Sequence, residues 1–522
     1  MQTEARRLNR WSWPFIAAGT IKALLIPAVG AVVASGGVLL AHLEFLSLLL
    51  IVPALGYGFI RQKVYSYRFT RDELVVRDGL LTKNVRHISF ERIHNVALVR
   101  NPIHRLLGVT TARIETAAGG KPEALLRVLS LEAADELRRY TLGEVRQDNA
   151  TDSPAARAAD KALLQVPDRE LVRLGLISNR GFIVVAAVMG VFSQMQWWDQ
   201  DWVKDRNWLS TFDGVRAKAP DWAAWLLDSG SLAGKVFLGL VLIAIFLVLL
   251  RLLSIAWYLV RYRGFTLRQT DEDLRAEYGL LTKVSSLIPV HRIQLVTVSS
   301  TLLHRCFDRI SIDVETAGAS TADSDLSGQL AASGVATTRQ WLAPIVETGR
   351  AAGFVHRVLP DVDVEAVEWK PIEARAALRI VKRVAIVVTP ITIILASVLT
   401  FFPIPLSGWH ALWLPSVVLP LSWLISRRWV SRAGYALTDR AVYFRSGWLS
   451  RRISVVRFVN MQTVSMHQTP FDVRKRMASV AVDTAGAGGA GHRIRIPFLD
   501  VDIAGSILQR LYAETRSTEF RW

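Results

Sequence analysis

Gly79-Leu80-Leu81-Thr82-Lys83 opens a pattern that the chain carries three times. In the first copy the pattern continues to Arg92-Ile93 and to Ile114-Glu115-Thr116-Ala117. The second copy runs from Gly279-Leu280-Leu281-Thr282-Lys283 through Arg292-Ile293 to Val314-Glu315-Thr316-Ala317, and the third runs from Gly447-Trp448-Leu449-Ser450 through Asn460-Met461 to Val482-Asp483-Thr484-Ala485. The three copies align without a gap. A fixed internal period requires one structural unit that explains every copy, and a period this long predicts a whole domain rather than a solenoid repeat.

The composition is that of a membrane protein with an anionic partner. Of the 522 residues 51% are hydrophobic and 17 are Trp, which is outside the usual range of soluble proteins. The net charge of +18 leaves nucleic acid and anionic lipid as candidate partners. The single cysteine, Cys306, cannot form an internal disulfide, which favours a reducing compartment for the folded parts.

Paired apolar runs precede each copy of the pattern. The first pair lies within residues 15–60, the second comprises 181–196 and 236–260, and the third comprises 384–403 and 412–425. A helix needs about 20 residues to cross the bilayer core. Residues 236–260 and 384–403 are long enough, whereas 181–196 and 412–425 are short and could be tilted spans, interfacial segments or buried core helices. We expect six spans in three hairpins, and therefore lipid rather than nucleic acid as the partner.

The flanking charges predict the orientation of the hairpins. Lys and Arg gather on the side of the repeats, as Arg6, Arg7, Arg10, Arg61, Lys63, Arg173, Arg180, Arg261, Arg263, Arg379, Lys382, Arg383, Arg427, Arg428 and Arg432. The opposite turn 404–410 has neither residue type, and the long turn 197–231 is rich in Asp and Trp. Cytoplasmic loops carry the excess of Lys and Arg, so the N-terminus and all three repeats are expected on the cytoplasmic side of the membrane.

Strand-like segments followed by one helix make up each repeat. In the first repeat, residues 65–70, 74–76, 85–93, 96–99, 110–116 and 125–129 are predicted strands, and Ser130 caps a predicted helix over 131–142. This order predicts a small barrel or bent sheet closed by a C-terminal helix.

The predicted boundaries follow from these assignments. They are an N-terminal hairpin over 1–64, a first β domain over 65–145, a linker and juxtamembrane helix over 146–180, a second hairpin with a Trp-rich outer loop over 181–261, a second β domain over 262–360, a linker and juxtamembrane helix over 361–383, a third hairpin over 384–428 and a third β domain over 429–522.

The repeated motifs resemble a known bacterial family. Tyr435-Ala436-Leu437-Thr438-Asp439-Arg440 in the third copy, and Gly79, Arg92, Val96, Glu115, Thr116 and Ala117 in the first, are similar to the pleckstrin-homology-like (PH-like) domain of membrane proteins of the YdbS/YdbT type. Three hairpins with three domains resemble the longer, YdbT-like arrangement over nearly the whole chain. The resemblance implies an α+β membrane protein whose hairpins are each followed by a PH-like domain of two antiparallel sheets and a C-terminal helix. It also implies no established enzymatic activity and a role in envelope maintenance or stress response.

No catalytic or metal-binding motif stands out among the polar residues. His87 and His94 are seven residues apart, so on one strand they would point to opposite faces. His104 and His304 occupy the same place in two repeats, where the third has Asp472, and a polar contact in a turn explains them. We therefore expect a non-enzymatic protein without cofactor or metal.

Basic clusters remain as the candidate chemistry. Lys and Arg exceed acids in the first and third repeats but not in the second. Candidate headgroup- or partner-binding residues are Arg86, Arg92, Arg100, Arg105, Arg451, Arg452, Arg474, Lys475 and Arg476. Each basic residue near an anionic leaflet contributes on the order of 1 kcal/mol. The alternatives are charges that serve only topology and solubility, a scaffold that oligomerises or binds a protein partner, and a transporter or lipid-moving protein that uses Lys22 and Arg251. The third copy has Asn460 in place of Arg92 and Arg292, which argues against that arginine as an obligatory ligand contact.

Overall fold

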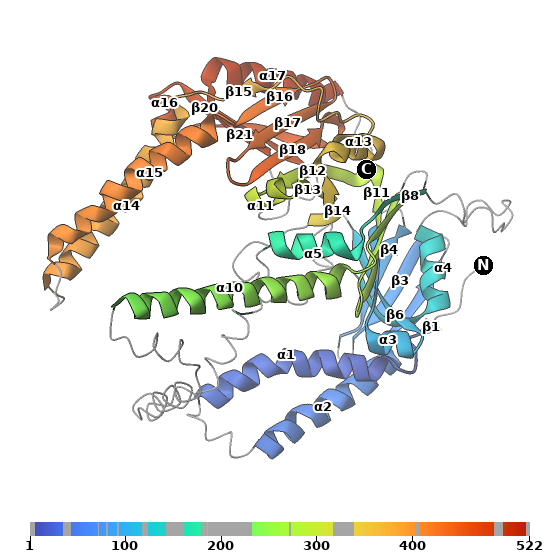
Figure 1. Cartoon of the computed structure of the whole chain (residues 1–522). Coiled ribbons are helices and arrows are strands. Elements are labelled where there is room, and N and C mark those ends of the chain that lie inside the picture. Colours follow the sequence, from blue (N-terminus) through green and yellow to red (C-terminus); the bar gives the residue numbers. More distant parts are fainter. Residues whose placement is uncertain are drawn as a thin grey trace.

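The computed structural model combines long helices with antiparallel sheets (Figure 1). It describes residues 6–34, 43–70, 72–79, 82–90, 93–116, 124–141, 161–178, 181, 185, 232–270, 273–316, 339–401, 407–484 and 494–517. The predicted span 181–196, apart from those two residues, and the Trp-rich turn 197–231 lie outside the described residues.

Each repeat has the same order of elements. Domain 1 comprises β1 (Arg6–Arg7), α1 (Ser12–Ala34), α2 (Leu43–Val64), β2 (Ser66–Phe69), β3 (Glu73–Asp78), β4 (Asn84–Ser89), β5 (Ile93–Arg100), α3 (Pro102–Leu106), β6 (Val109–Thr116), β7 (Ala124–Ser130) and α4 (Leu131–Thr141). Domain 2 comprises β8 (Lys161–Gln165), α5 (Asp168–Ile177), α10 (Leu232–Tyr262), β9 (Thr266–Thr270), β10 (Asp273–Tyr278), β11 (Lys283–Pro289), η5 (Val290–Arg292), β12 (Ile293–Ser300), α11 (Leu302–Cys306), β13 (Arg309–Thr316), β14 (Arg339–Glu347) and α13 (Thr348–Val358).

Domain 3 repeats this order once more. It comprises β15 (Lys370–Pro371), α14 (Ala376–Phe401), η7 (Gly408–Leu412), α15 (Trp413–Val430), β16 (Gly434–Leu437), β17 (Ala441–Ser446), β18 (Arg451–Arg457), η8 (Phe458–Asn460), β19 (Met461–His467), α16 (Pro470–Val473), β20 (Met477–Thr484), β21 (Ile494–Asp500) and α17 (Val501–Ser517). Strands β8 and β15 lie within the segments interpreted from sequence as linkers, and each pairs with the first strand after its helices.

Neighbouring domains share their sheets. The last three strands of domain 1 and the first strands of domain 2 form one seven-stranded sheet in the order β7-β6-β5-β11-β10-β9-β8. Domains 2 and 3 form a second one in the order β14-β13-β12-β18-β17-β16-β15. The four sheets together are here called the array. Its two end sheets are a four-stranded sheet ending in β4, in domain 1, and a three-stranded sheet beginning with β19, in domain 3.

The strand pairs that join the domains have the same register at both joints. Between domains 1 and 2, Lys283 faces Arg100. Between domains 2 and 3, Arg451 faces Ser300, and pairing continues to Val456 and Leu295. Lys283 and Arg451 both lie four residues after their turn glycine, and Arg100 and Ser300 both lie seven residues after the first residue of their strand. The two joints are therefore copies of one interface.

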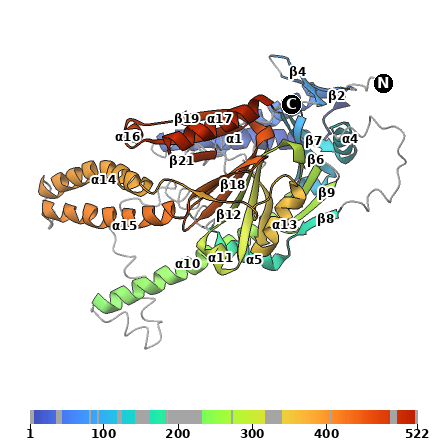
Figure 2. The same ribbon diagram turned by 90° about the horizontal axis from the view of Figure 1, so that it is seen from above.

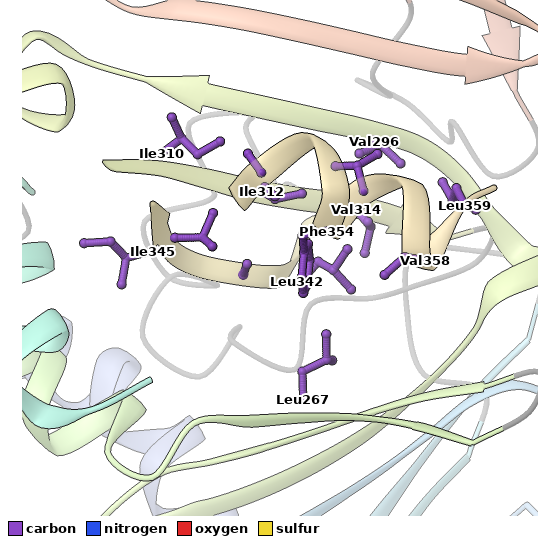
Figure 3. Packing of buried hydrophobic residues seen from close by; sticks show 14 of the residues in the cluster. Leu267, Val296, Ile310, Ile312, Val314, Leu342, Ile345, Phe354, Val358 and Leu359 are labelled. Atoms are coloured by element: carbon purple, nitrogen blue, oxygen red, sulfur yellow. The ribbon is translucent and has the colours of Figure 1, made fainter. Parts of the chain in front are cut away.

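A helix covers the second sheet of each domain. In domain 2, Phe354 and Val358 of α13 pack onto Ile312 and Val314 of β13, and Leu267 of the other sheet lies across the core (Figure 3). All five side chains are buried, and complete burial of such a side chain contributes about 1.5–3 kcal/mol. These contacts explain why the alternating strands need the C-terminal amphipathic helix.

The glycine that opens the repeated pattern is required by the backbone. Gly79, Gly279 and Gly447 have φ values of 120°, 114° and 93°, which side chains of L-residues rarely adopt. A Cβ atom would lie 1.8 Å, 2.0 Å and 1.8 Å from the carbonyl oxygens of Thr82, Thr282 and Ser450. The turn between the second and third strands of each domain therefore admits only glycine.

Long apolar helices leave one side of the array of sheets. Three of the described helices are long and apolar enough to cross a membrane: Gly239–Tyr262, Ala376–Phe401 and Gly408–Val430. Helices α1 and α2, of 23 and 22 residues, pack against each other. Figures 1 and 2 show α1, α10, α14 and α15 extending to the same side of the sheets.

Candidate membrane-contact surface

The segment from Pro470 to Arg476, here called the α16 segment, combines exposed apolar and basic side chains. Phe471 is 51% exposed and Val473 is 58% exposed, and Arg474 and Lys475 follow them on the surface. Arg476 has a positive φ of 54° and pairs with Asp502 at 3.0 Å in an exposed ion pair. Figures 1 and 2 place α16 at the end of domain 3 next to α14. This combination suits the boundary between headgroups and acyl chains.

A buried ion pair attaches the α16 segment to the base of α14. Arg379 Nε donates to Asp472 Oδ1 at 2.9 Å, and both side chains are only 8% exposed. Arg379 Nη2 donates to Thr469 Oγ1 at 3.1 Å, and the guanidinium lies 4.9 Å from the centre of the Phe471 ring. The apolar run begins at Val384, about 7.5 Å along the helix from Arg379 at 1.5 Å per residue. The segment is thus held one to two turns below the apolar part of α14.

Asp472 is an anion that the fold stabilises. Burial acts to raise its pKa, but hydrogen bonds from Thr469 and Arg379 and the charge of Arg379 act more strongly, so the pKa lies below its usual value. Its carboxylate also accepts from the backbone N–H of Thr469 at 3.1 Å, while Thr469 Oγ1 accepts from the Asp472 N–H. This reciprocal cap fixes the N-terminus of α16.

The same position holds a histidine in the other two repeats. His304 Nδ1 lies 2.9 Å from Thr301 Oγ1 and forms the corresponding cap of α11, and His304 Nε2 lies 3.0 Å from Ser311 Oγ. His104 is buried and its ring stacks on Phe15 of α1, with 4.2 Å between ring centres. The predicted polar contact in a turn is confirmed for His304 and Asp472.

Acidification should loosen α11 but leave α16 unchanged. Burial lowers the pKa of His304 below its usual value of 6.5, so the unfolded segment binds a proton more readily than the folded one. The stability of α11 is therefore complete above pH 6.5 and falls as the pH decreases below it. Hydrogen exchange of residues 302–306, corrected for intrinsic rates, should accelerate between pH 7.5 and 5.5, whereas exchange of residues 470–473 should not. Equal responses of the two segments would contradict the assignment.

Four of the sequence-predicted residues lie at the joints between domains. Arg105 Nη1 donates to the carbonyl oxygen of Leu280 at 3.4 Å, in the glycine turn of the next domain. Arg100 faces Lys283, and Arg451 and Arg452 of β18 face Ser300 and Ser299. These residues belong to the contact between domains.

The remaining first-repeat candidates do not join the α16 segment. Arg86 is an exposed residue of β4, at the far end of the array of strands from β19. Arg92 lies outside the described residues. Of the nine predicted residues, the structure therefore brings Arg474, Lys475 and Arg476 together beside α14, a helix long and apolar enough to cross a membrane.

Arg92, Arg292 and Asn460 occupy equivalent positions in the three repeats. The structure describes the second and third of them, and both donate a hydrogen bond across a joint between domains. Arg292 Nη1 donates to the carbonyl oxygen of Ile93, and Asn460 Nδ2 donates to the equivalent carbonyl of Ile293 at 2.6 Å. An arginine and an asparagine can both donate to a carbonyl oxygen, which explains why one replaces the other.

Sequence reasoning missed the residues that position the surface. In the sequence alone Arg379 is only one of several flanking charges, and Phe471 belongs to no motif. The available signal is the change from His104 and His304 to Asp472 in the third repeat. An acid replacing a neutral polar residue at a buried position predicts a cation nearby.

Comparisons with known proteins agree with the architecture. Residues 21–145, 227–344 and 377–515 match the family described as "Bacterial PH domain". The chain is also similar to the transmembrane protein YdbT of Bacillus subtilis (strain 168), with 22% identity over 437 residues that cover 81% of this chain and 80% of that protein. No solved structure matches the chain. Because the three matched segments together cover most of the chain and each contains strands of one domain, the protein belongs to the bacterial PH domain family.

Proposed function

We propose that this protein is a non-enzymatic component of the bacterial cytoplasmic membrane whose third PH domain contacts anionic lipid headgroups of the inner leaflet. In this proposal six spans in three hairpins hold all three PH domains in the cytoplasm. The α16 segment is the contact, and the joint residues Arg100, Arg105, Arg451 and Arg452 serve assembly of the domains.

The distribution of charge and aromatic residues supports this orientation. Basic side chains lie at the domain ends of the helices, where Arg427 of α15 lies 5.4 Å from the centre of the Trp423 ring. At the opposite end of the third hairpin, Trp409 and Trp413 are exposed and no charged residue occurs between 402 and 412. Basic residues on the cytoplasmic side and Trp at the interfaces are the usual signs of orientation in membrane proteins.

The single observation that carries the proposal is the attachment of the α16 segment by the Arg379–Asp472 pair. A segment with exposed Phe471 and Val473, followed by Arg474 and Lys475, is fixed beside the base of a membrane-spanning helix. Its local concentration at the leaflet is therefore high without any movement of the domain. Apolar insertion and attraction between opposite charges then act together.

A transport function has less support than lipid contact, because the charged residue Arg251 in an apolar helix has a structural partner. Arg251 Nη1 of α10 donates to the carbonyl oxygen of Ser178 at 2.9 Å, and Ser254 Oγ donates to the same oxygen at 3.2 Å. These bonds satisfy the C-terminal end of α5, where a helix carbonyl has no partner of its own. A structural role therefore accounts for Arg251.

Loss of two charges should weaken membrane contact of the α16 segment. The full-length protein with Phe471→Cys and Cys306→Ser, labelled with an environment-sensitive fluorophore, would be placed in nanodiscs containing phosphatidylglycerol. We expect a blue-shifted emission that Arg474→Gln with Lys475→Gln reverses, because two basic residues contribute about 2 kcal/mol, or about 30-fold in the contact equilibrium.

The matched control is Arg350→Gln with Arg357→Gln, which removes two charges from the exposed face of α13 in domain 2. It should leave the emission unchanged. Added salt should also diminish the blue shift, because surface charges are screened. An emission that is identical in phosphatidylcholine and phosphatidylglycerol discs would refute recognition of anionic headgroups.

A further inference from the structure

Two strand edges at opposite ends of the array have no neighbouring strand among the described residues. Strand β4 ends the four-stranded sheet of domain 1, and strand β19 ends the three-stranded sheet of domain 3. An open edge presents a row of backbone N–H and C=O groups that can pair with another strand. Among the outer strands of the four sheets, these two are the ones whose counterparts in the neighbouring domains pair across a joint.

The two open edges are complementary to each other. Strand β4 has the same place in domain 1 as β11 and β18 have in domains 2 and 3, and β19 has the same place as β5 and β12. Within the chain, β11 pairs with β5 and β18 pairs with β12. At each joint, the strand equivalent to β4 pairs with the strand equivalent to β19 of the preceding domain. Among the described residues, β4 of domain 1 and β19 of domain 3 have no such partner strand.

We propose that these two halves join between copies: β4 of one molecule pairs with β19 of a second copy of this chain. The association is head to tail, so it produces rings if the rotation closes and open arrays if it does not. The described apolar helices α1, α10, α14 and α15, which come from all three domains, extend to one side in Figures 1 and 2, and a fourth domain added by the same step keeps its helices on that side. The assembly can therefore lie in one membrane.

The register of the new joint follows from the two existing ones. Lys83 lies four residues after Gly79, and Gln468 lies seven residues after Met461, so these two residues occupy the places of Arg451 and Ser300. Continuing along the strands places Val85 opposite Met466.

The exposed side chains fit this register. Val85 is 49% exposed and Met466 is 38% exposed. At the joint between domains 2 and 3, their counterparts Ile453 and Val298 face each other and are partly buried against the core. Pairing of the open edges would cover Val85 and Met466 in the same way.

One contact of the existing joints is missing at the new one. Arg305 donates to the carbonyl oxygens of Trp448 and Leu449 at 3.1 and 3.2 Å, as Arg105 does to Leu280. The third copy has Val473 at this position. The joint between copies also lacks the covalent tether, so it is weaker than those within the chain and depends on concentration.

Disulfide trapping tests the pairing in the intact protein. In a Cys306→Ser background, a Val85→Cys chain and a Met466→Cys chain carrying different tags would be expressed together and oxidised in membranes. Directly opposed residues on antiparallel strands have Cα atoms about 4.5–5.5 Å apart, which suits a disulfide. We expect a crosslinked product that contains both tags. The matched control is a Val85→Cys chain expressed together with a Tyr512→Cys chain, whose cysteine lies on the exposed face of α17. This pair should give no crosslinked product.

Charge reversal provides a second measurement. Like charges that face each other across a strand pair are unfavourable and opposite charges are favourable. The mass of the solubilised full-length protein should therefore fall towards that of one copy when Val85→Lys is combined with Met466→Lys. It should recover when Val85→Lys is combined with Met466→Glu. We expect the association constants of these two double variants to differ by about threefold or more.

Three results would overturn the proposal. The first is a chain that stays a single copy at every concentration and gives no mixed crosslink. The second is a Val85→Cys chain that crosslinks to itself in preference to Met466→Cys, which would indicate symmetric pairing. The third is a different protein paired with β19 in place of a second copy.

Discussion

Asp472→Asn should increase hydrogen exchange in α16 and the start of β20 by about two to four orders of magnitude. The substitution keeps an oxygen that can cap Thr469, but it leaves the Arg379 guanidinium buried without its counter-charge. Breaking a buried pair in this way costs roughly 3–5 kcal/mol. Local exchange is the suitable measurement, because a chain with several domains does not unfold in two states.

A control variant and the direction in which stability changes with pH make this prediction specific. Glu373→Gln removes the partner of Arg375 in an exposed pair 3.5 Å apart, where the expected cost is about 0–1 kcal/mol. Because the pKa of Asp472 is lowered, its contribution is complete above its usual pKa of 3.8 and is lost as the pH falls below that value. Replacing both partners with apolar residues, as in Arg379→Met with Asp472→Leu, should recover most of the protection. If Asp472→Asn behaved like Glu373→Gln, the pair would not hold the α16 segment.

Gly279→Ala should separate domains 1 and 2 locally. Its φ of 114° alone costs an L-residue on the order of 1–3 kcal/mol, and the new Cβ atom would lie 2.0 Å from the carbonyl oxygen of Thr282. The same turn contacts domain 1, where Thr282 Oγ1 donates to Asn101 Oδ1 at 3.1 Å and Leu280 accepts from Arg105. Exchange should therefore rise in β11 and β5 together.

A helical glycine provides the comparison for this substitution. Gly505 in α17 has nothing within 4 Å of a Cβ atom and no positive φ. Gly505→Ala should be neutral or should stabilise α17 by up to about 1 kcal/mol. Protection of β11 and β5 that is unchanged in Gly279→Ala would show that the turn can rearrange without loss.

The repeat made much of the architecture predictable. The gapless pattern from Gly79, Gly279 and Gly447 implied three domains with one fold, and the family comparison confirms that assignment. Local signals placed the helices well, because α4 begins at Leu131 after Ser130, as the capping signal predicted. Alternating strand patterns and caps act over a few residues, so they can be recognised without knowledge of the rest of the chain.

The sharing of sheets was not predictable in the same way. Arg105 and Arg451 look like free surface charges in a count of Lys and Arg, yet one donates to a turn of the next domain and the other lies in a strand that crosses the boundary. Their partners are backbone groups, which every sequence provides, so the sequence contains no matching charge to detect. The exchange of Arg292 for Asn460 was the one visible sign, since both residues donate to a carbonyl oxygen.

The candidate surface was predicted in part for a related reason. Arg474, Lys475 and Arg476 are adjacent in sequence and therefore adjacent in space. The pair that positions them joins residues 93 positions apart, Arg379 and Asp472, and only the folded chain brings these together.

Because every sheet between the ends of the array begins in one repeat and finishes in the next, duplication can lengthen this protein without creating a new kind of contact. An inserted repeat would use the same register twice, once with each neighbour. The number of repeats can therefore change during evolution by whole units. A single repeat excised from the chain would expose two unpaired strand edges and would fold poorly by itself.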